Sequence, residues 1–271
     1  MTDIRKRMLA LRRAVVDYIY VQDALFLEPP EQRLFALSSG FALNNEMELA
    51  TKAQKVKAFR LWLKQQVDNG LLEVDGEFFE KPWMAPHVDS AYKKAVVRSY
   101  LDAKKGIAVP EQAAFMTEAF TSPVALEQLE LLYTRNFTKL EGITNAMDTQ
   151  MSSILTEGMA HGHGPRQIAG EMAKSVDKMT KTRAMTLART EIIHAYAEGQ
   201  LDSFERLGIK ELGVEIEWST AGDDRVCPLC QDMEGKIYTT ETARGVIPIH
   251  PNCRCAWIPY FPKDPTVRSS S

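Results

Sequence analysis

The sequence predicts an α+β protein, with a predominantly helical N-terminal region and C-terminal helices packed on a small sheet with a structural zinc knuckle. Three observations support this prediction. Apolar residues recur at helical spacing over most of the chain, a few short segments are suited to strands, and every cysteine lies between residues 227 and 255. The 271 residues, 45% hydrophobic and 25% charged, suffice for one large domain or two smaller ones.

Composition narrows the class of protein. The formal charge of -3 and the pI near 6.0 give no global basic field, so wrapping of nucleic acid by the whole chain is not expected. No stretch approaches the roughly 18 to 20 apolar residues of a membrane span. The first 20 residues carry charges where a signal peptide needs an apolar segment, so we expect a protein made inside the cell.

The first helix is expected from about residue 3 to 27, where Pro29 and Pro30 end it. Its apolar stripe follows alternating steps of four and three, interrupted by Gln22: Ile4, Met8, Leu11, Val15, Tyr18 and Leu25. The same helix carries five cations: Arg5, Lys6, Arg7, Arg12 and Arg13. Either these cations lie on a solvent-exposed face of the helix, or they contact phosphate or the acidic surface of a partner.

A second helical run, from about 46 to 68, ends at Asn69-Gly70. The segment LLEVDGEFF then predicts a β-hairpin around Asp75-Gly76. A helix followed by a hairpin can form a nucleic-acid-binding wing, although it is more often only a helix followed by a hairpin. The segment EKPWMAPH breaks the pattern, so we expect an N-terminal region at 1–82 and connecting helices at 83–123, placed at about 87–105 and 110–121.

From residue 124 to 159 a helical stripe continues far beyond the average helix, with Gly142 as a candidate bend. Its methionines are interpreted as core residues. The segment AHGHGPRQ ends this helix, and Pro165 suits the first position of the next one. His161 and His163 are interpreted as part of a flexible loop, with metal binding as the alternative.

A last long helix is expected from about 180 to 207. Arg189 falls in line with Met185, Ile192 and Tyr196, and no carboxylate stands three or four residues away from it. We therefore expect Arg189 to form a buried ion pair with Asp223 or Asp224, which would hold this helix to the C-terminal part of the chain.

The cysteines predict a metal site. Cys227-x-x-Cys230 is followed, after 19 residues, by His250-x-x-Cys253, and this spacing of two short pairs is typical of zinc. Four such ligands fill a tetrahedral shell and leave no position for a catalytic water, so one structural zinc per chain is predicted on Cys227, Cys230, His250 and Cys253. Cys255 is an alternative to His250 or Cys253. Paired disulfides or a redox motif remain further alternatives.

Several ordered elements resemble a known family. They are Ala188-Arg189-Thr190-Glu191, Trp218 with Thr220, the run from Asp224 to Pro228 leading to Cys230, Asp232 and Gly235, and the closing HPNCRC at 250–255. Over about residues 125–260 the chain resembles the C-terminal domain of the phage Mu F-like minor head proteins, the head-morphogenesis family of tailed phages and prophages. We therefore expect this domain at 124–260, its zinc knuckle at 227–255, and a loose tail at 261–271.

The resemblance implies a minor structural protein of a tailed-phage or prophage head. Such a protein is made in the bacterial cytoplasm, lies inside the capsid, and associates with the portal protein during procapsid assembly and DNA packaging or ejection. The major capsid or scaffolding protein and non-specific contact with packaged DNA are further expected partners, and no membrane is. The basic N-terminal helix is a candidate docking element. In a reducing cytoplasm, metal would replace disulfides in the small terminal module.

Two alternatives belong to other functional classes. The family is remotely similar to the ADP-ribosyltransferase fold, to which Arg189, Ser219 and Thr220 would correspond; the glutamate signature is missing, with Glu234 and Glu241 only in expected loops. A zinc-ribbon DNA-binding protein is the second alternative, because four basic residues flank the cysteines: Arg225, Lys236, Arg244 and Arg254. Five acidic residues dilute their charge, and enzymatic activity is not expected.

Overall fold

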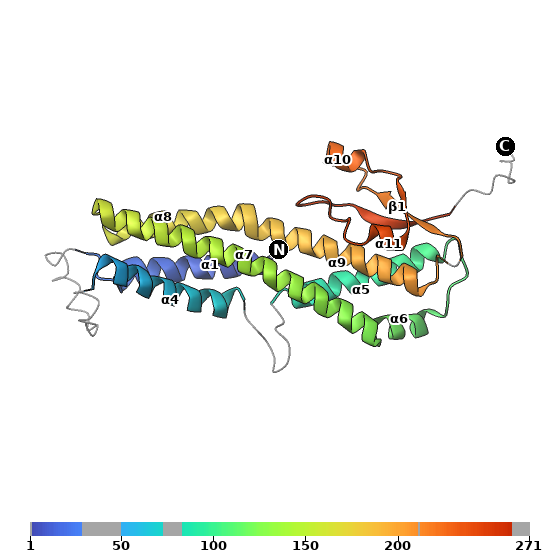
Figure 1. Ribbon diagram of the computed structural model, residues 1–271, viewed down its shortest axis with the longest axis horizontal. Coiled ribbons are helices and arrows are strands. Elements are labelled where there is room, and N and C mark those ends of the chain that lie inside the picture. The colour runs from blue at the N-terminus through green and yellow to red at the C-terminus, as the bar shows by residue number, and fades with distance from the viewer. Residues whose placement is uncertain (1, 29–49, 73–82, 211, 262–271) are drawn as a thin grey trace. The chain divides into compact units, whose positions relative to one another are not determined.

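The computed structural model describes residues 2–28, 50–72, 83–210 and 212–261. It confirms the predicted fold class, because long helices dominate and a three-stranded antiparallel sheet lies near the C-terminus (Figure 1). The expected hairpin around Asp75-Gly76, the prolines at 29 and 30, and the tail from 262 onward lie outside the described residues. Among those that are described, no helix is long and apolar enough to span a membrane.

The chain forms two compact units, each assembled from separate stretches of sequence. The helical unit comprises Met1–Trp83 and Phe137–Thr186, and the mixed unit comprises Met84–Asn136 and Leu187–Ser271. Their boundaries fall within the helix Pro123–His161 and near the start of the helix Met185–Arg206. The four consecutive segments expected from the sequence, 1–82, 83–123, 124–260 and 261–271, stay predictions as domains.

Helices that pack along one another form the helical unit (Figure 1). They are α1 (Thr2–Val16), the π-helical turn η1 (Asp17–Val21), α4 (Lys52–Gly70), the second part of α7 (Pro123–His161), α8 (Pro165–Met179) and the π-helical turn η3 (Thr180–Ala184). The apolar stripe predicted for α1 is buried and packs against α8. Thr51 and Gln54 cap the start of α4 reciprocally, each side chain accepting the other residue's backbone N–H.

The first helix ends earlier than expected. Helical structure stops at Val21, because Asp23 and Phe26 adopt positive φ values of 42° and 50°. The Asp23 carboxylate accepts the backbone N–H groups of Leu27 and Glu28 at 2.6 and 3.2 Å, which stabilises the turn. Leu25 is still fully buried. The periodicity therefore identified a core residue correctly but assigned it to a helix instead of a turn.

The long helix α7 is continuous through Gly142, as the sustained stripe predicted, and its Met147 and Met151 are fully buried. Pro165 begins α8 at the first helical position, which confirms the interpretation of AHGHGPRQ as a break. The helix expected from about 180 is different in detail. Helical structure runs from α8 through η3 into α9 (Met185–Arg206), so the π-helical turn lies where a helix start was expected.

The mixed unit surrounds α9. Around it lie α5 (Ala85–Ala103), α6 (Gln112–Thr121), the first part of α7, and the strands β1 (Glu215–Ser219), β2 (Ile237–Tyr238) and β3 (Ala256–Tyr260), in the sheet order β2-β1-β3. Two single-turn helices, α10 (Pro228–Gln231) and α11 (Thr240–Ala243), lie between the strands in sequence. The strands β1 and β3 pair with Trp218 opposite Trp257.

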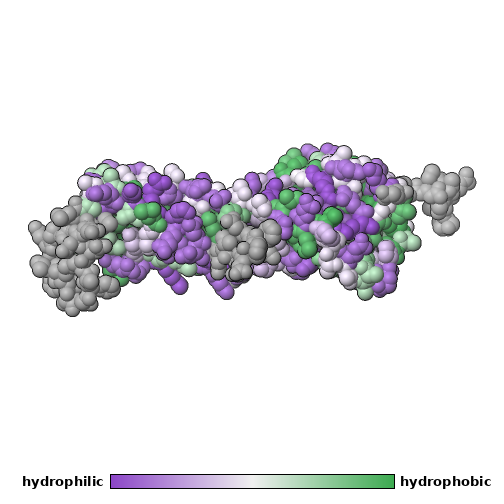
Figure 2. Space-filling model, turned by 60° about the horizontal axis from the view of Figure 1, so that its bottom comes forward, coloured by the Kyte–Doolittle hydropathy of each residue, from purple (hydrophilic) through white to green (hydrophobic). Residues whose placement is uncertain are grey.

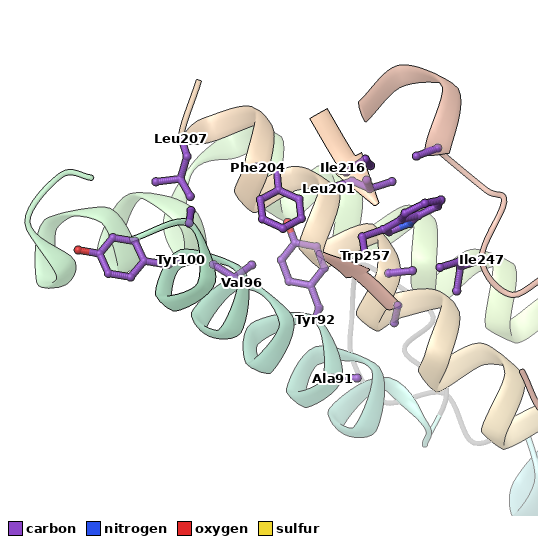
Figure 3. Packing of buried hydrophobic residues seen from close by; sticks show 14 of the residues in the cluster. Ala91, Tyr92, Val96, Tyr100, Leu201, Phe204, Leu207, Ile216, Ile247 and Trp257 are labelled. Carbon is purple, nitrogen blue, oxygen red and sulfur yellow. The ribbon is translucent and has the colours of Figure 1, made fainter. Parts of the chain in front are cut away.

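Packing of α5 against α9 forms much of the core of the mixed unit. Tyr92 and Val96 of α5 lie against Leu201 and Phe204 of α9 (Figure 3). Gly199 permits this close approach, because an added Cβ would stand 2.7 Å from the carbonyl oxygen of Tyr92. The apolar side chains left exposed are distributed in patches, and on the face shown in Figure 2 hydrophilic residues predominate.

Buried polar side chains of α9 also hold the sheet. Gln200 is 2% exposed, and its amide donates to the carbonyl of Trp257 at 2.7 Å while accepting the backbone N–H of Trp257 at 2.9 Å. The side chain of Gln200 thereby satisfies the backbone N–H and carbonyl of Trp257 at the edge of β3, which a further strand would otherwise bind. Glu191, also buried, accepts from Arg135 of α7 at 2.9 Å. The helix α9 is thus fixed by apolar and polar contacts together.

Candidate metal centre

The first pair of potential ligands lies at the start of α10. Cys227 occupies the N-cap position, with Pro228 at the first helical position and Cys230 within the turn. Backbone N–H groups at the beginning of this turn, that of Cys230 foremost, point at the sulfur of Cys227 and lower its pKa. The local fold therefore makes this thiol easier to ionise than an ordinary cysteine, and the thiolate is the form that binds metals.

The second pair lies in the turn that precedes β3. The backbone N–H of Cys253 donates to the carbonyl of His250 at 3.1 Å, and Asn252 adopts a left-handed φ of 61°, which asparagine tolerates. The backbone N–H of Asn252 donates to the hydroxyl of Thr190 on α9 at 3.2 Å. This contact joins the metal-binding turn to the central helix.

The structure brings the four predicted ligands together. His250 Nε2 lies 3.1 Å from the sulfur of Cys227 and 3.0 Å from that of Cys230, and the sulfurs of Cys230 and Cys253 are 4.0 Å apart. The other ring nitrogen, Nδ1 of His250, lies 2.8 Å from the carbonyl oxygen of Pro251. When Nδ1 carries the proton of the neutral imidazole, it donates to that carbonyl, and Nε2 is then the nitrogen that can bind a metal ion.

Cys255 is part of the same cluster. The potential ligands form two overlapping groups, Cys227 with Cys230 and His250, and Cys230 with Cys253 and Cys255. Cys230 belongs to both groups, so five side chains gather where a tetrahedral ion uses four. The predicted set of Cys227, Cys230, His250 and Cys253 remains a prediction, and Cys255 remains its alternative.

The chemistry of the cluster fits a metal ion. Burial raises the pKa of Cys255 to about 11 and also raises that of Cys230, so without a cation these thiols resist ionisation. A divalent ion reverses this preference because it stabilises the thiolates directly. All four cysteines are free thiols, and thiolate with imidazole is a donor set that suits zinc.

Aromatic residues form the small core beneath the cluster. Trp218 and Trp257 are fully buried, with ring centroids 5.4 Å apart at 90°. Tyr238 of β2 packs its ring edge-on to Trp257 at 5.1 Å. Such edge-to-face pairs stabilise beyond the area that they bury. The cluster therefore rests on a packed sheet face.

The predicted ion pair of Arg189 is wrong. Arg189 is exposed on α9 and forms no ion pair with a described residue. Asp223 instead pairs with Arg254 at 2.5 Å and with Arg225 at 3.0 Å, and these guanidinium groups, Arg254 foremost, hold its pKa below its ordinary value. The helix α9 is buried on several sides, so a one-stripe pattern could not indicate which of its residues face solvent.

Sequence reasoning missed the ion-pair network that joins the C-terminal segment to α9. Arg244, after α11, pairs with Glu198 at 3.0 Å and with Asp202 and Glu205 at 2.6 Å. Burial opposes the charge of Arg244, but its ion pairs with Asp202 and Glu205 outweigh burial and raise its pKa. The spacing of three carboxylates at 198, 202 and 205, one side of a helix, was an available signal for a cationic partner.

The geometry also bears on the two alternative functional classes. Three of the four basic residues of the zinc-ribbon hypothesis, Arg225, Arg244 and Arg254, are in ion pairs, which leaves less charge for phosphates. Ser219 ends β1, and the backbone N–H of Thr220 donates to Glu234 at 2.7 Å. Within the described part of the chain no hydrogen bond or ion pair joins Arg189 to Ser219 or Thr220.

The part of the chain that contains the cluster is similar in sequence to a known protein family. Residues 149–258 match the family described as Phage Mu protein F like protein. This part of the chain is similar to the Mu F-like proteins. The match begins within α7 and ends in β3, so it confirms the resemblance seen in the sequence, with a later start than residue 125. It includes all five potential metal ligands.

No curated protein and no solved structure matches the chain significantly.

Proposed function

We propose that this protein is a minor structural component of a tailed-phage or prophage head, located inside the capsid and associated with the portal during procapsid assembly and DNA packaging or ejection. The observation that carries the proposal is the Mu F-like match, which includes α8, α9, the sheet and the metal cluster. The protein is made in the bacterial cytoplasm. Its partners are the portal protein, the major capsid or scaffolding protein, and packaged DNA.

A structural zinc in each chain completes the proposal. The ion joins α10 to the turn before β3 through Cys227, Cys230, His250 and Cys253. Four protein ligands leave no position for a substrate or a catalytic water. Such an ion stabilises a small module that has little core of its own, and it suits a reducing compartment where disulfides do not persist. The domain therefore acts in assembly and not in catalysis.

Procapsids purified from a host that expresses the phage genes test the assignment. We expect the protein in the particles at low copy number, resistant to added protease in closed heads and cleaved once the heads are opened. Particles made without the portal protein should contain much less of it. A protein that stays in the soluble fraction, or that is cleaved in closed heads, contradicts the proposal.

A further inference from the structure

Neither unit carries a large excess of positive charge. Over the full sequence, the two stretches of the helical unit include 18 basic and 17 acidic residues, a formal charge of +1, and those of the mixed unit include 15 and 19, a formal charge of -4. A polyanion would therefore be bound by a local group of cations and not by a unit as a whole.

The helix α8 and the turn η3 carry a row of cations on their exposed side. Arg166, Gly170, Lys174, Lys178 and Lys181 follow steps of four, four, four and three, so they form one ridge along the helix. All five are exposed, whereas the buried side of α8 is apolar. From Arg166 to Lys181 the ridge is about 23 Å long at 1.5 Å per residue.

The cations of this row have no acidic partner among the described residues. None of Arg166, Lys174, Lys178 and Lys181 forms an ion pair with any residue that the structure describes. In the mixed unit Arg98, Arg135, Arg244 and Arg254 are paired, whereas Arg189 and Arg206 form no ion pair with a described residue. Like charges at Lys174 and Lys178, one turn apart, repel and destabilise the helix slightly.

The helix dipole does not account for these charges. Cations are favourable at the C-terminus of a helix, but here the helical chain continues from α8 through η3 into α9. The π-helical turn instead leaves three successive residues exposed: Lys181, Thr182 and Arg183. Such turns are rare, and they occur frequently at functional sites.

The neighbouring helix α1 adds charge beside the ridge. Arg12 of α1 pairs with Asp177 of α8 at 3.1 Å, which joins the two helices. Lys174 and Lys181 stand three residues before and four after Asp177, on the same side of α8 and η3. Arg5 stands seven residues before Arg12, on the same side of α1, and it is exposed.

The ridge borders a shallow hollow of about 580 Å³, whose lining includes Arg166, Gly170, Glu171 and Lys174. Glu171 is the one carboxylate in this lining, and it lies 3.9 Å from His163. At Gly170 a Cβ would meet nothing within 4 Å, so the glycine lowers the surface between the two flanking cations. A rod-shaped ligand can lie along such a surface.

We propose that the ridge Arg166–Lys174–Lys178–Lys181 binds the phosphate backbone of duplex DNA without sequence preference. Its exposed residues are charged, polar or glycine, whereas the centre of a protein–protein interface is usually apolar. The absence of aromatic side chains among them also argues against stacking on unpaired bases. Duplex DNA supplies one negative charge per about 1.7 Å, dense enough to engage every cation of the ridge.

This inference deepens the proposed function, since packaged DNA is the polyanion that a protein inside the head would meet, and it names the surface that makes the contact. The N-terminal helix was the element expected to dock from the sequence. In the structure two of its five cations are engaged: Arg12 pairs with Asp177, and Arg7 donates to the carbonyl of Gly70 at 2.8 Å. The row on α8 carries the larger free charge.

Binding of the full-length protein to a labelled 30-base-pair duplex of arbitrary sequence, followed by fluorescence anisotropy at 50 to 200 mM NaCl, tests the inference. We expect micromolar affinity that falls steeply with salt. The variant K174Q/K178Q/K181Q should bind at least about tenfold more weakly at 100 mM salt, and the slope of log affinity against log salt should decrease by about 2 to 3. Its thermal unfolding should be unchanged, because all three side chains are exposed.

The variant K94Q/K104Q/K236Q is the matched control, because it removes the same charge from exposed positions of the mixed unit. It should change the affinity less than twofold. Equal loss in both variants, or no binding by the unaltered protein at 50 mM salt, overturns the inference. So does a polyglutamate peptide that competes with DNA at equal charge, because the surface would then be specific for an acidic protein. Procapsid incorporation of the ridge variant, measured separately, reports on the proposed function alone.

Discussion

At the scale of single residues, Cys230 is the most informative ligand, because it belongs to both groups of potential metal-binding side chains and is 3% exposed. We expect one zinc per purified chain, and we expect Cys230→Ser to lose it, because the remaining side chains no longer complete a tetrahedral shell. Metal analysis of the purified proteins measures this. Fully folded protein that contains no metal would contradict the prediction.

The choice between Cys253 and Cys255 is decided by a pair of serine variants. If the ligands are those predicted from spacing, Cys253→Ser loses most of the zinc and Cys255→Ser retains about one ion per chain. His250→Gln should behave as Cys253→Ser does. Retention of zinc by Cys253→Ser together with loss in Cys255→Ser would assign Cys255 as the fourth ligand.

A glycine tests the packing of α5 on α9. In Gly199→Ala the new Cβ would stand 2.7 Å from a backbone oxygen, that of Tyr92, which cannot rotate away. We expect the free energy of unfolding to fall by about 2 kcal/mol. Gly142→Ala is the control, because Gly142 is at an exposed position of α7 and nothing lies within 4 Å of an added Cβ. This variant should raise the free energy of unfolding by up to about 1 kcal/mol, because alanine favours the helix more than glycine does. Chemical denaturation measures both, and equal effects would refute the close approach.

At the scale of elements, α9 connects the metal module to the rest of the mixed unit. Thr190 contacts the metal-binding turn, Gln200 satisfies the edge of β3, and Glu198 and Asp202 bind Arg244. These contacts spread along about three turns of the helix, so α9 aligns the C-terminal segment. Its buried polar residues hold the C-terminal segment in position.

Arg244→Met should be strongly destabilising, because it leaves the carboxylates of Glu198 and Asp202, 11% and 7% exposed, without their cation. Loss of one partner from a buried ion pair costs about 3 to 5 kcal/mol, although the partial exposure of Arg244 favours the lower end. Arg98→Met is the control, because Asp102 retains Lys105 and the effect should stay under about 1 kcal/mol. Urea unfolding of both variants measures these effects. Similar midpoints for Arg244→Met and Arg98→Met would show that the network around Arg244 contributes little to stability.

At the scale of the whole molecule, metal binding and folding of the C-terminal segment should be coupled. The ligands lie on two turns separated by 19 residues, so the ion closes a loop whose own core is small. A chelator should therefore make the segment after α9 sensitive to protease while the helical unit stays resistant. Limited proteolysis with mass spectrometry measures the cleavage sites. Unchanged resistance after the zinc has been removed would contradict a structural role.

Acid should have the same effect as a chelator. Protons compete with the ion for the thiolates and for Nε2 of His250, so the stability that the metal contributes is present at neutral pH and is lost as the pH falls. Zinc release followed with a colorimetric chelator, together with tryptophan fluorescence of Trp218 and Trp257, should show one shared transition. Loss of the metal at a higher pH than the fluorescence change would separate binding from folding.

Local patterns in the chain were enough to predict the helical stripes, the break before Pro165, the zinc-type spacing and the resemblance to the Mu F-like family, because helix periodicity and chelating pairs depend on near neighbours. The end of the first helix at Val21 depended on a local turn, in which Asp23 accepts two backbone N–H groups and which apolar periodicity does not indicate. Two features depended on distant contacts: the exposed position of Arg189 and the partners of Arg244. The division into two units, each built from separate stretches, belongs with them. A sequence pattern does not indicate that a helix is packed on several sides, or that ion pairs join residues 39 to 46 positions apart. Only the tertiary structure determines these features, because it brings distant parts of the chain together.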